Sequence, residues 1–164
     1  MDIYAYLKKD HRLVKDLMEE FLGTDSTPKR EQLFAKIRDE LEIHAETEEK
    51  TFYAAIKEKG GKGLKEKEDH AEDEHGEIRK FLHDMDAAEP GSEEWLIAFG
   101  ELKHSVEHHV EEEEGELFEK AKKVLSESRA EALAKEMDEL KQKKQKNRKE
   151  TKEAEEGLLN RLIF

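Results

Sequence analysis

The sequence predicts an all-α fold: an up-down-up-down four-helix bundle with an additional helix at its C-terminal end. Only two prolines interrupt the 164 residues, so long segments are free to form helices. Four of these segments each carry one apolar stripe with the 3-and-4 spacing of a helix face. The connections between them are short, and short connections make successive helices antiparallel neighbours.

The composition requires an economical core. Charged residues make up 45% of the chain, with 43 acidic against 30 basic residues and a net charge of -13. The mean hydropathy of -1.03 approaches that of disordered chains. Long amphipathic helices can still fold, because each contributes only one stripe to the core. We expect the bundle to occupy residues 1–125 and a charged helical extension to occupy residues 126–164.

Several classes of protein are disfavoured. The chain has no cysteine, which excludes disulfides, thiolate metal sites and cysteine nucleophiles. No apolar run approaches the roughly 18 residues of a membrane span, and the N-terminal MDIYAYLKKD lacks the apolar region of a signal peptide. The acidic balance argues against nucleic-acid binding. We therefore expect a soluble, cytoplasmic protein with no membrane or nucleic-acid partner.

The first two helices have recognisable ends. One is expected over about residues 2–22, with Gly23 as its stop. The next begins at Thr27 and Pro28, an N-cap followed by proline at the first helical position. It continues to about residue 59, where two glycines follow.

The other three helices follow the same logic. A third is expected over about residues 64–86, before a Pro-Gly pair. Ser92 caps a fourth that reaches about residue 125. The capping-box pattern at Ser128 opens a fifth that reaches about residue 156.

Polar residues stand in the middle of the four apolar stripes, where leucine or isoleucine is expected. Burying such groups without partners costs roughly 1–3 kcal/mol each, and more for a charge. Metal ions would satisfy all of them if the four helices bring them together. The six in-stripe candidates are His11, His44, Glu48, His75, His109 and Glu113.

The chain repeats itself. HAETEEKTFY at 44–53 matches HVEEEEGELF at 109–118, and DHRLVKDLM around His11 matches EHGEIRKFL around His75. The stretches 3–59 and 64–125 therefore read as two copies of one helical hairpin. A pseudo-twofold axis would bring one histidine and one His-x-x-x-Glu pair from each copy to the centre.

The spacing suits a two-metal site. Residues i and i+4 of a helix lie about 5–6 Å apart and can address one site. Four imidazoles and two carboxylates suit two divalent first-row metals, and Fe, Zn, Cu and Ni all accept imidazole. If both carboxylates bridge, each metal has two histidines and two glutamate oxygens. Open positions then remain for water, oxygen or peroxide.

At these six residues the sequence resembles the hemerythrin-like HHE cation-binding family. That family carries His, His-x-x-x-Glu, His and His-x-x-x-Glu on four successive helices around a non-haem di-iron centre. The resemblance covers about residues 2–125. It implies two iron ions bridged by an oxo or hydroxo group, with Zn or Mn as possible substitutes and no organic cofactor. The four histidines would be terminal ligands, and Glu48 and Glu113 would bridge.

The resemblance also implies a function: binding or reacting with oxygen, peroxide or nitric oxide, in sensing or in iron handling. Oxygen-carrying hemerythrins have a further histidine in a His-x-x-x-His motif on the third helix. Ala71 and Arg79 stand at the positions four before and four after His75, which disfavours reversible oxygen carriage. The residues do not decide between an enzyme and a binding module.

Three alternatives remain open. A ferritin-like di-iron oxidase would favour Glu-x-x-His motifs and more carboxylates. A storage or sensory module would hold the same metals without turnover. A metal-free helical scaffold would use its fifth helix for assembly.

Other candidates are expected outside the site. His70 and His104 lie five residues before a candidate ligand, about 140° around a regular helix, so we favour surface positions. A π-bulge would instead bring residues i and i+5 together. His108 is expected at the flank of the site. We expect solvated faces for Glu49, Glu111, Glu112 and Glu114, with a hydrogen bond from Glu112 to a ligand residue as the alternative. We expect rim packing for Tyr4, Tyr6 and Tyr53.

The extension has two unusual stretches. Residues 141–152, KQKKQKNRKETK, are strongly basic and predict a solvated helix, or alternatively a contact with the acidic bundle. The terminal LLNRLIF is apolar and is expected to dock on the bundle or on another subunit. A homodimer or a protein partner could use this extension.

Overall fold

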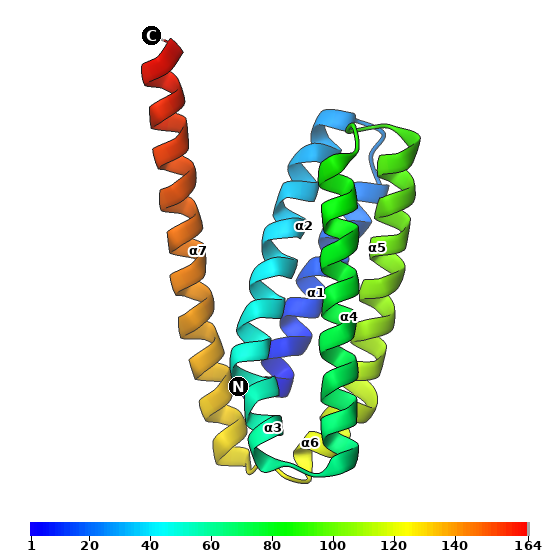
Figure 1. Ribbon diagram of the computed structural model, residues 1–164, viewed down its shortest axis with the longest axis vertical. Helices are drawn as coiled ribbons and strands as arrows, with labels where there is room; N and C mark the ends of the chain where they lie inside the picture. The colour runs from blue at the N-terminus through cyan, green and yellow to red at the C-terminus, as the bar shows by residue number, and fades with distance from the viewer. Residues whose placement is uncertain (164) are drawn as a thin grey trace.

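The structure is a computed structural model that describes residues 1–163, and its elements are all helical (Figure 1). Two of the long helices contain a short π-helical segment, labelled η. The elements are α1 (Ile3–Leu22), α2 (Thr27–Glu48), η1 (Glu49–Tyr53), α3 (Ala54–Lys59), α4 (Lys62–Ala87), α5 (Glu93–Glu112), η2 (Glu113–Leu117), α6 (Phe118–Lys122) and α7 (Glu127–Ile163).

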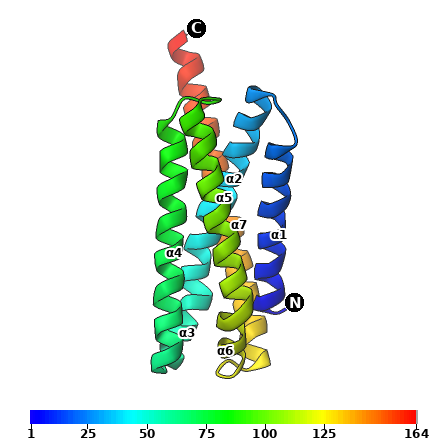
Figure 2. The ribbon, with the colours of Figure 1, turned by 90° about the vertical axis from the view of Figure 1, so that its right-hand side faces the viewer.

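The predicted up-down-up-down bundle is confirmed. Its four rods are α1, the continuous α2–η1–α3, α4, and the continuous α5–η2–α6 (Figures 1 and 2). α1 packs mainly against α2, and α4 packs mainly against α5, as two hairpins do. The fifth helix, α7, lies outside the bundle against α1 and α2. None of the helices in residues 1–163 is long and apolar enough to cross a bilayer.

Side-chain caps define most helix starts near the predicted positions, but Ser26 caps α2 in place of the predicted Thr27, which is the first residue of the helix. Asp2, Ser26 and Ser92 each accept a hydrogen bond from the backbone N–H three residues later. The fifth helix begins earlier than predicted, because Ser126 caps it through the Arg129 N–H at 3.1 Å. It also ends later, at Ile163 rather than near residue 156, since no proline interrupts it.

The core is divided by a polar layer. The buried apolar residues form two clusters, which lie on opposite sides of the buried histidines along the helices. One cluster contains Ile3, Leu7, Phe52, Tyr53, Phe118, Leu133 and Met137 among others. The other contains Val14, Phe21, Ile37, Leu82, Trp95 and Phe99 among others.

The first half of α7 belongs to the structure of the bundle. Leu133 and Met137 are fully buried in the first of these clusters. Further along, Lys141 pairs with Asp10 at 2.6 Å, and Lys144 and Arg148 pair with acidic residues of α2. The basic stretch 141–152 therefore contacts the acidic bundle, which is the second of the two alternatives. The division of the chain at residue 125 stays a prediction.

The apolar end of α7 does not dock on the bundle. Leu158, Leu159, Leu162 and Ile163 are 56–77% exposed, and this end projects away from the other helices in Figure 1. The expectation of docking on the bundle is wrong, because α7 stays straight while its pairing with α2 stops near Lys152. Docking on another subunit stays a prediction, and Phe164 lies outside the described residues.

Two leucines of α7 offer a matched test of this arrangement. Leu133→Ala should lower the free energy of unfolding by about 2–4 kcal/mol, because it opens a cavity in the shared core. Leu158→Ala removes the same atoms from an exposed site and should change it by less than about 0.5 kcal/mol. Urea unfolding followed by circular dichroism measures both. Equal effects would contradict the placement of α7.

Candidate metal centre

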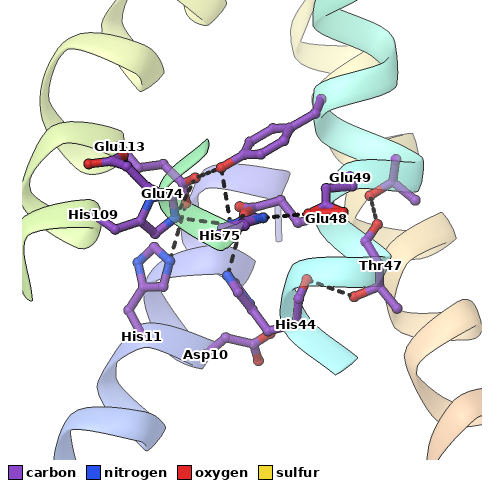
Figure 3. A network of polar contacts seen from close by, with 12 residues as sticks. Asp10, His11, His44, Thr47, Glu48, Glu49, Glu74, His75, His109 and Glu113 are labelled. Atoms are coloured by element: carbon purple, nitrogen blue, oxygen red, sulfur yellow. Dashed lines mark hydrogen bonds and ion pairs between the residues drawn. The ribbon is translucent and has the colours of Figure 1, made fainter. Parts of the chain in front are cut away.

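The structure brings all six candidate residues to one place between the four rods (Figure 3). His11 comes from α1, His75 from α4 and His109 from α5. His44 and Glu48 lie one turn apart on α2, and Glu113 begins η2. Every one of them is at most 8% exposed. The stripe positions predicted this convergence correctly.

The six residues form two overlapping groups that share both glutamates. One group is His11, His44, Glu48 and Glu113, and the other is Glu48, His75, His109 and Glu113. Within each group the possible ligand atoms lie within 4.8 Å of one another.

Each glutamate reaches a histidine from both groups. Glu48 Oε1 lies 3.0 Å from His75 Nε2 and 3.5 Å from His44 Nε2. Glu113 lies 3.2 Å from His11 Nε2 and 3.3 Å from His109 Nε2. Both carboxylates therefore stand between the two groups, where a bridging ligand would stand.

A ring of outer carboxylates orients the four imidazoles. Each Nδ1–H donates to a carboxylate at 2.8–3.0 Å, which leaves Nε2 turned toward the centre. The four pairs are His11 with Glu114, His44 with Asp10, His75 with Glu49, and His109 with Glu74.

The outer carboxylates follow the internal repeat. Asp10 comes directly before His11, and Glu74 comes directly before the equivalent His75. Each of these carboxylates accepts a hydrogen bond from the second histidine of its own hairpin, which is His44 for Asp10 and His109 for Glu74. Glu49 follows Glu48, and Glu114 follows Glu113. Each accepts a hydrogen bond from a histidine of the opposite hairpin, which is His75 for Glu49 and His11 for Glu114. The expectation of solvated faces for Glu49 and Glu114 is wrong. A Glu-Glu pair occurs at the equivalent position of both repeats, and this was the sequence signal that could have indicated a role for the second glutamate.

The π-helical segments explain why consecutive glutamates serve the site. In a regular α-helix adjacent side chains point about 100° apart, so one of them lies at the side of the core-facing stripe, as Asp10 does beside His11. η1 begins at Glu49 and η2 begins at Glu113, and the wider turns let both neighbours reach inward. The helix around His70 and His104 is regular, and both side chains are exposed, so the surface positions favoured for them are confirmed.

Tyr53 is a further residue of the centre. It is fully buried, its hydroxyl donates to Glu113 Oε2, and its ring stacks on His75 with 5.2 Å between centroids. The expected rim packing of Tyr53 is therefore wrong. Burial and the nearby charges of Glu113 and Glu48 raise the pKa of Tyr53 well above its usual value, so it remains a proton donor. Phe118 holds the equivalent position in the second hairpin and breaks the symmetry.

Several buried atoms at the centre have no well-aligned hydrogen-bond partner within residues 1–163. They are His11 Nε2, His44 Nε2, both oxygens of Glu48, and Glu113 Oε1. Each such atom costs roughly 1–3 kcal/mol when nothing else satisfies it. Imidazole nitrogens and carboxylate oxygens are ligands for divalent first-row metals, so the donor set fits metal ions.

The carboxylates around the centre favour the protonated form of three of its imidazoles. Burial alone would lower the pKa of His109, but Glu113 and Glu74 outweigh it and raise the pKa to about 10. Burial likewise opposes charge on His11 and His44, yet their carboxylate partners raise both pKa values. Metal ions must therefore displace protons from the imidazoles, so binding weakens as the pH falls.

Comparison with known proteins identifies the family of this chain. The sequence model of the hemerythrin HHE cation binding domain matches residues 2–121, so the chain belongs to this family. A crystal structure of a hemerythrin HHE cation binding domain-containing protein from Mycobacterium kansasii superposes with a TM-score of 0.78. That match covers 90% of this chain and 89% of the other at 21% identity, which shows a common fold.

One curated relative matches this chain over only part of its own length. A protein from Nostoc sp. named DNA nickase is 29% identical over 136 residues. The match covers 83% of this chain but 38% of the Nostoc protein.

The raised pKa of His109 gives a pH prediction for the metal-free protein. A folded-state pKa of about 10 lies above the unfolded value near 6.5, so the stabilisation is complete below about pH 6.5. It is lost progressively as the pH rises toward 10. We expect the melting temperature to fall over this range, and to fall less steeply in His109→Gln. Melting curves in chelator-treated buffers between pH 6 and 10 measure it; parallel slopes would contradict the pairing of His109 with its carboxylates.

Proposed function

We propose that this chain is a non-haem di-iron protein that binds or reacts with oxygen, peroxide or nitric oxide. His11, His44, His75 and His109 would be terminal ligands, and Glu48 and Glu113 would bridge the two ions. The observation that carries the proposal is the pair of His₂Glu₂ groups that share both glutamates. Bound iron would supply redox chemistry and open coordination positions.

The space beside the centre favours a very small ligand. A cavity of about 20 Å³ lies against the four histidines and is lined on its other sides mainly by Val14, Leu41, Ile78 and Val106. This volume suits one water molecule or one diatomic molecule. The apolar lining disfavours charged or bulky substrates. The chain would therefore select its ligand mainly by size and polarity.

An approach to this cavity runs between α1 and α5. A surface groove of about 720 Å³ shares His11, Val106 and Val110 with the inner cavity. Lys8, Arg12 and Lys15 lie along the same groove. A small molecule could pass between the valines from the groove to the histidines.

Tyr53 would position Glu113 and supply a proton donor at the centre. Its hydroxyl lies 3.4 Å from His75 Nε2 as well as against Glu113. Because it stays protonated, it can donate a hydrogen bond to an oxygen ligand or hold the carboxylate in one orientation. The centre thus has a polar side at Tyr53 and an apolar side at the small cavity.

The alternatives fit the site less well. A ferritin-like oxidase would be richer in carboxylates, whereas this centre has four imidazoles and two central carboxylates. A metal-free scaffold leaves the unpartnered central atoms unexplained. The DNA-nicking activity in the name of the Nostoc protein is not part of this proposal, because a net charge of -13 repels a phosphate backbone.

Removing both central carboxylates tests the ligand assignment. Glu48→Ala combined with Glu113→Ala should reduce iron content at least about tenfold, because both ions lose their shared ligands. Elemental analysis after anaerobic iron loading measures it, with circular dichroism to verify folding. Glu46→Ala with Glu111→Ala is the matched control, because these glutamates occupy equivalent positions in the two repeats and neither is buried in the centre. Full iron content in the double variant of the buried pair would refute the assignment.

A second variant tests access without touching a ligand. Val110→Phe fills the passage between the groove and the inner cavity, so iron content should stay unchanged. Nitric oxide binding and peroxide consumption by the iron-loaded protein should become several-fold slower. Stopped-flow absorption measures the nitric oxide step. Unchanged rates would place the entry elsewhere.

The same assays distinguish an enzyme from a binding module. Wild-type peroxide consumption over many turnovers would identify an enzyme, whereas nitric oxide binding without peroxide consumption would favour a sensory or storage module.

A further inference from the structure

A second cluster of histidines and glutamates lies on the surface between α4 and α5, which run side by side in Figure 2. His70 and Glu74 come from α4, and His108 and Glu112 come from α5. None of them belongs to the central six. Both histidine side chains are 55% exposed, so solvent reaches the cluster directly.

The sequence pattern of the cluster repeats the pattern of the central ligands. His70 and Glu74 are four residues apart on one helix, and so are His108 and Glu112. Such pairs lie one turn apart on the same helix face. Because the two helices are antiparallel neighbours, the two pairs face each other across their contact.

The distances match a four-coordinate metal. Glu112 Oε2 lies 3.0 Å from His70 Nε2, and Glu112 Oε1 lies 3.2 Å from His108 Nε2. Glu74 Oε2 lies 3.7 Å from the first of these nitrogens and 3.5 Å from the second. Ligand bonds of about 2.0–2.2 Å give a tetrahedron with edges of about 3.3–3.6 Å. The four side chains therefore need only small adjustments to hold one ion.

Glu74 gives this cluster a second, independent feature, which is a buried carboxylate oxygen that lacks a hydrogen-bond partner. It is 94% buried, being only 6% exposed, and its Oε1 accepts the hydrogen bond from His109. Its Oε2 is buried, faces the two exposed histidines and has no hydrogen-bond partner in the described residues. A buried carboxylate oxygen without a partner is costly unless a cation satisfies it.

The other hairpin shows what satisfies the equivalent atom there. Asp10 occupies the position of Glu74 in the repeat and holds His44 through Oδ2. Its second oxygen accepts from the buried Lys141 of α7 at 2.6 Å. The fold thus places a cation on the outer oxygen of Asp10, while no lysine or arginine occupies that place on Glu74 within residues 1–163.

We propose that His70, Glu74, His108 and Glu112 form a separate mononuclear site for a divalent first-row metal such as Zn²⁺. Two imidazole nitrogens and two carboxylate oxygens suit this ion in four-coordinate geometry. The bound ion would satisfy the outer oxygen of Glu74, as Lys141 satisfies the outer oxygen of Asp10. Glu74 would bind this ion through Oε2 while its Oε1 accepts the hydrogen bond from His109. The charge of the ion therefore acts on the central site through Glu74.

Cobalt(II) is the probe for this site, because its visible absorption reports four-coordinate binding. The metal already in the purified protein is measured first, and the protein is then saturated with Co²⁺ and desalted. Wild type should retain one more cobalt ion per chain than His70→Ala combined with His108→Ala. The four-coordinate absorption should disappear in that variant. The comparison does not depend on what the central site holds, since both proteins keep all six central residues.

His83→Ala combined with His104→Ala is the matched control, with one exposed histidine removed from each of the same two helices. It should bind cobalt as wild type does. Equal cobalt binding by wild type and the His70/His108 variant would overturn the proposal and leave these histidines only as surface contacts of Glu112. Equal loss in the His83/His104 variant would also overturn it, because the ion would then be held by other surface imidazoles.

Discussion

Hydrogen bonds from buried imidazoles to outer carboxylates determine how this bundle is built. An imidazole whose Nδ1–H is held by a carboxylate has one orientation and one tautomer, and its Nε2 becomes a directed ligand. Four such pairs link the rods at one level and separate the core into two apolar clusters. The four rods must keep one register along their axes for these pairs to form. The apolar stripes alone are compatible with several registers, so the polar layer selects one of them.

The duplicated hairpin makes the centre nearly symmetric, and the departures from symmetry are informative. Tyr53 in the first hairpin corresponds to Phe118 in the second, so only one side of the centre has a buried phenol. Asp10 is paired with Lys141, whereas Glu74 faces two exposed histidines. These differences give the two His₂Glu₂ groups different surroundings. They also explain why α7 belongs with the bundle, since its lysine completes one of the outer carboxylates.

Helical periodicity predicted most of this architecture from the sequence. The rods, their order and all six central residues follow from apolar stripes interrupted by histidine and glutamate. Of the residues that periodicity missed, Asp10 and Glu74 lie in the regular helices α1 and α4, whereas Glu49, Tyr53 and Glu114 lie within the π-helical segments. There the 3.6-residue rule fails, because an added residue per turn rotates the following side chains. The contact of Lys141 with Asp10 joins residues 131 positions apart, and no local pattern reports it.

The central claim is that two metal ions share Glu48 and Glu113 between four imidazoles. A crystal of the iron-loaded protein, with anomalous scattering measured at the iron edge, tests it directly. The account predicts two iron peaks per chain, one beside His11 and His44 and the other beside His75 and His109, with both glutamates between them. A single peak at the centre, or iron bound only at the surface while the centre stays empty, would contradict it.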